Sequence, residues 1–135
     1  MAYCSESDLI ERFGEAEITQ LSDRAGLGVL DSAVIAGAIA DADAEIDGYL
    51  SGRYALPLAS VPAVMVRLAC DISRYYLFGH DVTDLVKERY DQAIAYLVKI
   101  ATGVIGLGPE DPGPDSGTAS VQSDTRAFAV GMERL

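Results

Sequence analysis

The chain has 135 residues, half of them hydrophobic, which suits a single domain with a modest tail. Its 21 acidic residues against 10 lysines and arginines give a formal charge of −11, which excludes a broad basic surface for binding nucleic acid. No apolar run approaches the roughly 20 residues that a membrane span needs, and the start, MAYCSESDLIERF, has no signal-peptide pattern. We therefore expect a soluble protein of a reducing cytoplasm.

Two short helices are predicted at the start of the chain. Residues 5–13, SESDLIERF, begin with a capping serine and early acids, and then carry apolar residues at helical spacing. Residues 15–21, EAEITQL, predict a further turn or two of helix. A glycine-containing loop, DRAGLGVLD, follows them.

The first long helix is predicted from Ser32 to about Gly52. Asp31 precedes it as an N-cap, and Gly52 is a plausible stop. Its apolar residues recur at intervals of three and four, which defines one buried stripe. The stripe consists of Val34, Ile35, Ala38, Ile39, Ala42, Ile46, Tyr49 and Leu50.

The second long helix is expected to be the central one. Pro62 fits just inside its first turn, where the missing N–H of proline costs nothing. The residues that follow, as far as Phe78, are apolar on most sides, which is typical of a helix packed all round. Gly79 is expected to end it.

The third long helix is predicted to begin at a cap, either Asp81 or Thr83, and to run to about Ala101. Gly103 is a natural stop after it. These signals together predict an all-α fold, a small bundle of about four to five helices.

The chain changes character after this bundle, which we assign to residues 1–105. Residues 106–117 are dense in proline and glycine and are typical of a linker. Residues 118–135 have no helical period, although RAFAV alternates enough to form a short strand, given a partner. We expect an extended C-terminal arm that docks on its own domain or on a neighbour. The alternative is a disordered tail.

The loop after the second helix resembles an EF-hand calcium loop that lacks ligands. Aligned from Asp23, it has Ala25, Leu27 and Val34 where calcium loops carry oxygen ligands, and only Asp31 adds a second carboxylate. Calcium takes six to eight oxygens. We therefore expect a turn that allows positive φ at its glycines and caps the next helix, and no metal site.

The sequence shows no pattern of catalytic residues. His80 follows a glycine at a helix end and has no positioned partner, so we expect a surface position. No nucleophile elbow is present, and GVIGLG lacks the ending of a phosphate loop. Cys4 and Cys70 lack metal-ligand spacing, and Cys70 fits a small core residue. We expect no enzyme activity, no cofactor and no metal.

Charged residues on the long helices allow two interpretations. Asp43 and Asp47 share a helix face and could hold a weak divalent ion, although ordinary solvated charge is the expectation. Arg53, Arg67 and Arg74 are expected to pair with local carboxylates or with a partner.

The order of these segments resembles that of Mu-like prophage proteins of unknown function, which are encoded among head and tail morphogenesis genes. The strongest segments are AEIDGYLSGRYALPL and VPAVMVRLACDISRYYL. The resemblance covers about residues 3–103, and more loosely the ending TRAFAVGMERL. In that family the loop between the second and third helices commonly has more of the acidic residues of a calcium loop. Ala25 and Leu27 depart from that pattern here.

The family in turn resembles the helical head–tail connector proteins of long-tailed phages. That resemblance implies a structural adaptor in the virion neck, assembled in the host cytoplasm as a ring of about twelve subunits. The implied partners are further copies of the chain, the portal protein and a tail-completion or terminator protein. DNA would pass through the ring without sequence-specific binding, and no membrane is involved.

Two further functions stay open on the sequence alone. One is a small helical binding module that uses its arm as a partner motif, and the other is an enzyme that uses the acidic helix with a divalent ion.

For the connector, we predict three contact regions. They are the arm with Arg126, Phe128 and Met132, the GRYALPL loop with Arg53, Tyr54 and Leu56, and an acidic face with Asp43 and Asp47 as candidates to line the lumen. The alternative for Tyr54 and Leu56 is that they close the end of the core.

Overall fold

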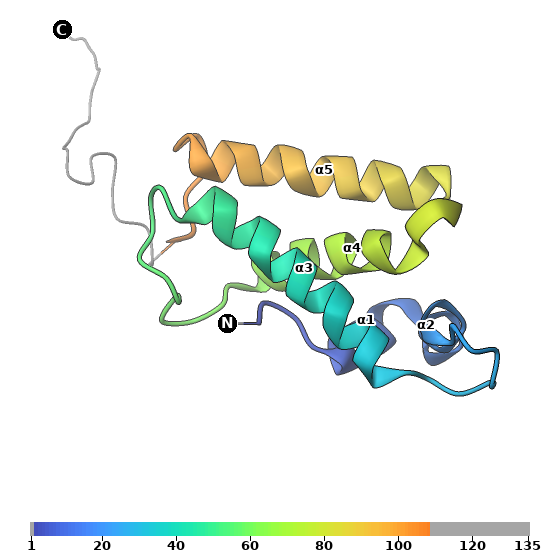
Figure 1. The fold of residues 1–135 in the computed structure, drawn as a ribbon. Helices are drawn as coiled ribbons and strands as arrows, with labels where there is room; N and C mark the ends of the chain where they lie inside the picture. The colour runs from blue at the N-terminus through green and yellow to red at the C-terminus, as the bar shows by residue number, and fades with distance from the viewer. Residues whose placement is uncertain (1, 109–135) are drawn as a thin grey trace, which may run out of the picture.

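A computed structural model describes residues 2–108. These residues form five α-helices and one turn of 3-10 helix, and they contain no strand (Figure 1). The helices are α1 (Glu6–Phe13), α2 (Glu15–Ser22), α3 (Ser32–Leu50), α4 (Ala63–Phe78), η1 (Gly79–Asp81) and α5 (Asp84–Ala101). The predicted all-α bundle is therefore confirmed. Most of the predicted linker and the whole arm, including the expected strand, lie outside the described residues.

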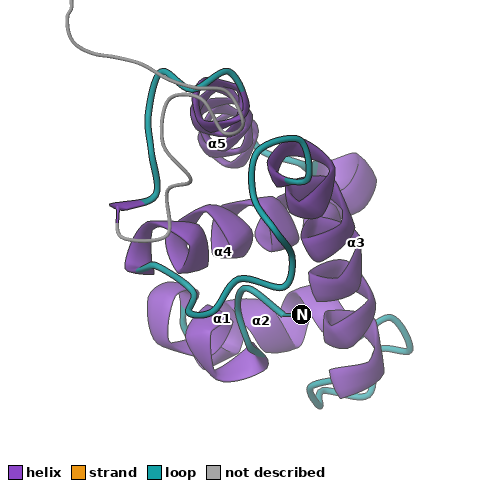
Figure 2. Ribbon diagram, turned by 90° about the vertical axis from the view of Figure 1, so that its left-hand side faces the viewer, coloured by secondary structure: helices purple, strands orange, loops and turns teal. Residues whose placement is uncertain are grey.

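Helix α4 lies at the centre of the bundle, as its apolar sequence predicted. It contacts α3, α5, α1 and α2. Figure 2 shows α5 above α4, the short helices α1 and α2 below it, and α3 to one side. Within residues 2–108 no helix is long and apolar enough to cross a membrane.

Local capping chemistry sets most helix ends. Ser5 and Asp8 form a reciprocal capping box on α1, and Asp31 accepts hydrogen bonds from the first N–H groups of α3. Thr83, one of the two expected residues, caps α5. Gly79 ends α4 at φ +63°, a conformation that L side chains rarely adopt.

Two predicted boundaries were wrong by one or two residues. Pro62 is the N-cap of α4 and not its first helical residue, because its backbone is extended at ψ 152°. Helix α3 ends at Leu50, with Ser51 as its C-cap, so Gly52 lies in the turn beyond the helix end.

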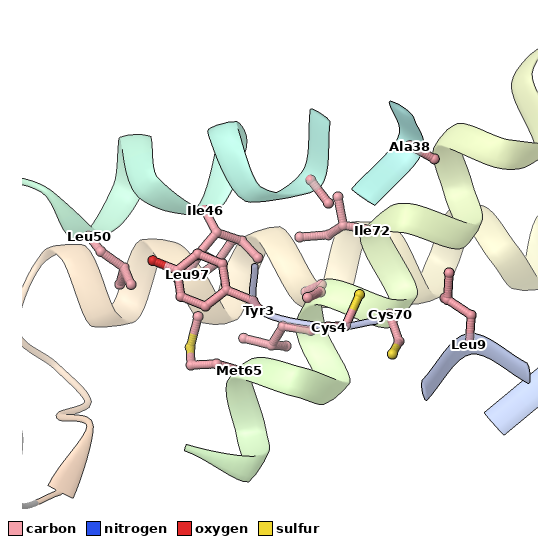
Figure 3. Packing of buried hydrophobic residues seen from close by; sticks show 14 of the residues in the cluster. Tyr3, Cys4, Leu9, Ala38, Ile46, Leu50, Met65, Cys70, Ile72 and Leu97 are labelled. Carbon is pink, nitrogen blue, oxygen red and sulfur yellow. The ribbon is translucent and has the colours of Figure 1, made fainter. Parts of the chain in front are cut away.

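The core is built from the predicted stripes together with the N-terminal segment. Ile46 and Leu50 of α3 lie with Met65 and Ile72 of α4 and with Leu97 of α5 (Figure 3). The segment before α1 adds Tyr3 and Cys4, which are both buried. Cys70 is a buried free thiol, as its apolar surroundings predicted, and the neighbouring Cys4 thiol together with burial raises the pKa of Cys70.

Asp71 is a buried carboxylate in the middle of α4. It is 5% exposed, and no side chain or backbone group in residues 2–108 forms a hydrogen bond or ion pair with it. Burial raises the pKa of Asp71, while the nearby charges of Arg89, Arg67 and Arg74 lower it. Burying an ionised group without a hydrogen bond costs free energy.

We expect Asp71→Asn to raise the free energy of unfolding at pH 7 by roughly 1 kcal/mol. Because the folded-state pKa is raised, the folded protein binds this proton more tightly than the unfolded chain does. Stability contributed by Asp71 therefore rises as pH falls. The advantage of the asparagine variant should shrink as pH falls through the raised folded-state pKa, and it should vanish well below the ordinary aspartate pKa of about 3.9, where both states are protonated. Urea unfolding across this pH range checks it, and a gain that grows on acidification would contradict it.

Candidate functional site

The loop between α2 and α3 is a turn closed by the carboxylate of Asp23. The Asp23 carboxylate accepts hydrogen bonds from the N–H groups of Leu27 at 2.8 Å and Gly28 at 2.6 Å. Asp31 is occupied in capping α3, and Gly26 and Gly28 take positive φ. The predicted turn is confirmed. Residues 2–108 contain no group of three histidine, cysteine or acidic residues that could hold a metal ion.

We expect Asp23→Ala to lower the free energy of unfolding by about 1 kcal/mol, because two backbone N–H groups lose a charged acceptor. Chemical denaturation measures this change. The matched control is Asp41→Ala, which removes an exposed carboxylate without a hydrogen bond in the described part of the chain. Calorimetric titration of the wild type with calcium should be flat, and a calcium-binding isotherm would show that the turn is also a metal site.

The carboxylates of α3 bind tyrosines from other parts of the chain. Asp43 accepts a hydrogen bond from the backbone N–H of Tyr3 at 3.0 Å, and Asp47 accepts one from the Tyr3 hydroxyl at 2.5 Å. These two acids share a face, as predicted, but both are half-buried and hold the N-terminal segment. Burial raises the pKa of Asp43. Their assignment to a lumen stays a prediction.

Glu45 joins three helices through a second set of hydrogen bonds. It accepts from the Tyr76 hydroxyl of α4 at 2.6 Å and from the Tyr90 hydroxyl of α5 at 3.1 Å. Tyr90 also stacks on Tyr75, with ring centroids 3.9 Å apart. Burial and the bond to Glu45 raise the pKa of Tyr76, so this hydroxyl stays a donor at neutral pH.

The GRYALPL loop closes one end of the core. Tyr54 is 6% exposed, and its hydroxyl accepts a hydrogen bond from the Leu107 N–H. Leu56 is half-buried against the core, and Arg53 donates to the Ile100 carbonyl at the end of α5 at 3.1 Å. For Tyr54 and Leu56 the structure therefore shows the alternative interpretation, in which they close the core. A partner-binding role for this loop stays a prediction.

The arginines divide into two groups. Arg74 forms the expected local ion pair, with Nε and Nη2 donating to Glu17 at 2.7 and 3.1 Å, and its guanidinium lies 4.2 Å from the centre of the Phe13 ring. Arg67 is exposed and has no hydrogen bond or ion pair within residues 2–108. The predicted arm residues Arg126, Phe128 and Met132 lie outside the described residues.

One open hollow of about 600 Å³ lies between α2 and the end of α4. Glu17, Arg24 and Asp81 supply its charged groups, and Leu77 and Phe78 are among its apolar ones. Arg24 is occupied, since it donates to the carbonyls of Leu21 and Leu77. His80 is exposed on η1, as expected for a surface position. The hollow is not lined by a serine, cysteine or histidine nucleophile.

Sequence reasoning missed the residues that join elements far apart in the chain. The Tyr3–Asp43 and Glu45–Tyr90 contacts span 40 and 45 residues. Only the tyrosines at the end of α4 and in α5 indicated such contacts from sequence. A tyrosine on a buried helical stripe usually needs a hydrogen-bond partner for its hydroxyl, but the sequence does not identify that partner.

These observations define a small helical protein whose half-buried carboxylates and tyrosines hold its own elements together. A family model described as "Bacteriophage Mu, Gp36" matches residues 3–124. The chain therefore belongs to the Mu Gp36 family, and it is a phage protein.

Two relatives support this membership. The chain is 39% identical over 109 residues to the "Mu-like prophage FluMu protein gp36" of Haemophilus influenzae, covering 81% of this chain and 77% of the relative. It is 32% identical over 139 residues to "Gene product J" of Escherichia phage Mu, covering 96% of this chain and 95% of the relative.

Proposed function

We propose that the protein is a head–tail connector subunit that forms a ring in the neck of a Mu-like phage particle. In this proposal the ring lies between the portal protein and a tail-completion or terminator protein, and DNA passes through it. A ring of about twelve copies is the expectation from the connector resemblance.

The observation that supports this proposal most is the helical fold, in a chain that belongs to a phage Mu protein family. Its described residues form a helical bundle, which is the fold that the connector resemblance implies. Fold alone does not fix function, so the proposal also depends on the surfaces of the bundle.

The charge of the chain suits a wall along which DNA slides. With 21 acids against 10 lysines and arginines, the chain as a whole repels phosphate, and the genome would not adhere to it. A subunit that gripped DNA through many phosphate contacts would instead slow its passage, because each contact adds affinity.

The residues after the bundle give each copy a means of reaching a neighbour. The described chain ends at Gly108, and 27 residues with Arg126, Phe128 and Met132 follow it. In the proposal these residues dock on an adjacent subunit, where main-chain pairing or apolar anchors supply the affinity.

The second candidate is a small binding module that uses the same C-terminal residues to capture one partner. The hollow between α2 and α4 is a place where such a partner could also be seated. A module of this kind would bind as a single copy, whereas the connector joins the particle as a set of copies with rotational symmetry.

Labelling the protein within the particle tests the connector directly. Induced phage carrying an epitope tag on this chain are decorated with gold-conjugated antibody and imaged by electron microscopy. Label at the junction of head and tail is expected. Label on the capsid shell or the tail tip, or its absence from complete particles, would contradict the proposal, and a tagged tail protein serves as the positional control.

A further inference from the structure

Three exposed arginines of this acidic chain act on a single buried carboxylate, that of Asp71. They are Arg12 on α1, Arg67 on α4 and Arg89 on α5, and none forms a hydrogen bond or ion pair within residues 2–108. The other arginines there are engaged, and Lys87 is paired with Asp91. In a chain with 21 acids, three cations that share one buried carboxylate leave an excess of positive charge, which indicates a further partner on another molecule.

These arginines gather on one side of the molecule, which we call the arginine face and define by Arg12, Arg67 and Arg89. Arg67 and the buried Asp71 are four residues apart, so they lie on the same side of α4. Helices α1 and α5 both pack against α4 and bring Arg12 and Arg89 toward that carboxylate, whose ionised form all three charges favour.

The opposite side of α4 is covered by α3, and every charged residue of α3 is acidic. Helix α3 carries Asp41, Asp43, Glu45 and Asp47 and no lysine or arginine. Asp47 and Glu45 accept hydrogen bonds from tyrosine hydroxyls, and Asp43 accepts one from the backbone N–H of Tyr3, so no cation of the bundle neutralises these carboxylates through a hydrogen bond in residues 2–108. Asp41 with Glu45 and Asp43 with Asp47 form two rows that border the exposed outward side of α3. We call this outward side, bordered by the four acids, the acidic face.

The two faces point in opposite directions. Tyr76 of α4 donates to Glu45 and therefore marks the side of α4 that meets α3. Arg67 is nine residues from Tyr76, which is two and a half helical turns, so it lies on the far side of α4. Figure 2 shows α3 along one side of α4 only.

We propose that the arginine face of one copy docks on the acidic face of a second copy. The argument for a second copy is charge complementarity between two faces that each subunit carries on opposite sides. In a dimer joined by such a head-to-tail contact, one subunit still has a free arginine face and the other a free acidic face. Further copies can therefore add until a ring closes. Exposed Ala36, Ala40 and Ala44 on α3 give the arginines a close approach to its backbone.

This inference rests on the proposed function and adds the surface through which copies meet. Asp43 and Asp47 then lie at the boundary between copies, as one of the predicted contact regions, and not on the channel wall. A nucleic-acid partner for the arginine face is disfavoured, since Asp71 lies within the cluster and the chain is strongly acidic.

The experiment compares two double charge reversals in the full chain. Arg67→Glu with Arg89→Glu reverses the arginine face, and Lys87→Glu with Lys99→Glu changes the charge equally at other exposed positions. Light scattering and sedimentation over a range of concentrations at low salt measure self-association. We expect the first variant to associate roughly tenfold more weakly than the wild type, and the control to stay within about twofold. Circular dichroism and thermal unfolding verify that both fold.

Complementation distinguishes docking from a structural effect. A second chain carries Asp41→Arg and Ala44→Arg, which make the acidic face basic. Each reversed chain alone should associate poorly, because like charges meet. A mixture of the two should associate as the wild type does, with the two chains alternating. Loss of helical structure alone would not be restored by mixing.

Each remaining outcome has a definite meaning. If the arginine-face variant associates as strongly as the wild type, or the wild type does not self-associate either alone or on tail-less heads, the inference is overturned. If rings form through another face and occupy the neck, the proposed function stands without the inference. If the copies associate through these faces but the label is absent from the neck, the proposed function fails while the inference stands. Retention of DNA by the wild type but not by the arginine-face variant would overturn it in favour of a nucleic-acid surface.

Discussion

Tyr3→Ala should lower the free energy of unfolding by about 3 to 5 kcal/mol, the largest single-residue effect that we expect in the bundle. Tyr3 is 1% exposed, and its ring lies in the core with residues of α3, α4 and α5 (Figure 3). Truncation removes this ring, leaves a cavity and deprives Asp47 of its hydroxyl donor. Urea unfolding monitored by circular dichroism measures the loss.

Tyr3→Phe separates the ring from the hydroxyl. It keeps the packing and removes only the hydrogen bond to Asp47, so we expect a loss of about 1 to 2 kcal/mol. Tyr49→Ala is a suitable control, because that tyrosine is only half-buried, near the end of α3. If Tyr3→Ala cost no more than Tyr49→Ala, the N-terminal segment would not be part of the core.

Arg74→Ala should cost about 2 to 3 kcal/mol, the second largest effect. The side chains of Arg74 and Glu17 are 14% and 30% exposed, and two hydrogen bonds join them. The guanidinium also packs on the Phe13 ring of α1. Arg74 therefore holds both short helices against α4, and its loss removes packing as well as charge.

A double-mutant cycle with Glu17→Gln isolates the ion pair. We expect a coupling energy of about 1 to 2 kcal/mol between the two positions, because both are largely shielded from water. Arg67→Ala on the same helix is the matched control and should change stability by less than about 0.5 kcal/mol. Additive effects of the two substitutions would mean that the pair contributes nothing beyond its separate contacts.

The helices could be predicted from sequence because their signals are local. The apolar stripe of α3, the cap at Asp31 and the stop at Gly79 each depend on residues within a few positions, and all three predictions are confirmed. The error at Pro62 arose because proline has a suitable φ both at the cap and in the first helical turn, so composition alone does not separate these positions.

The polar contacts could not be predicted because they join distant segments. Nothing near Tyr3 in the sequence indicates that its hydroxyl reaches α3, and nothing near Glu45 indicates two tyrosine donors from different helices. Periodicity assigned Asp43 and Asp47 to one face, but only tertiary packing shows which segment that face binds. Tyr54 is a similar case, since a loop tyrosine can equally anchor a partner or close a core.

The mass of the full chain in solution, alone and with tail-less phage heads, tests the connector most directly. Light scattering of the isolated protein and quantitative mass spectrometry of washed heads give the number of copies. The connector proposal predicts either a closed ring in solution or a fixed set of copies, about twelve, bound at each portal vertex. A chain that stays monomeric and does not bind the heads would contradict it and would favour the binding module.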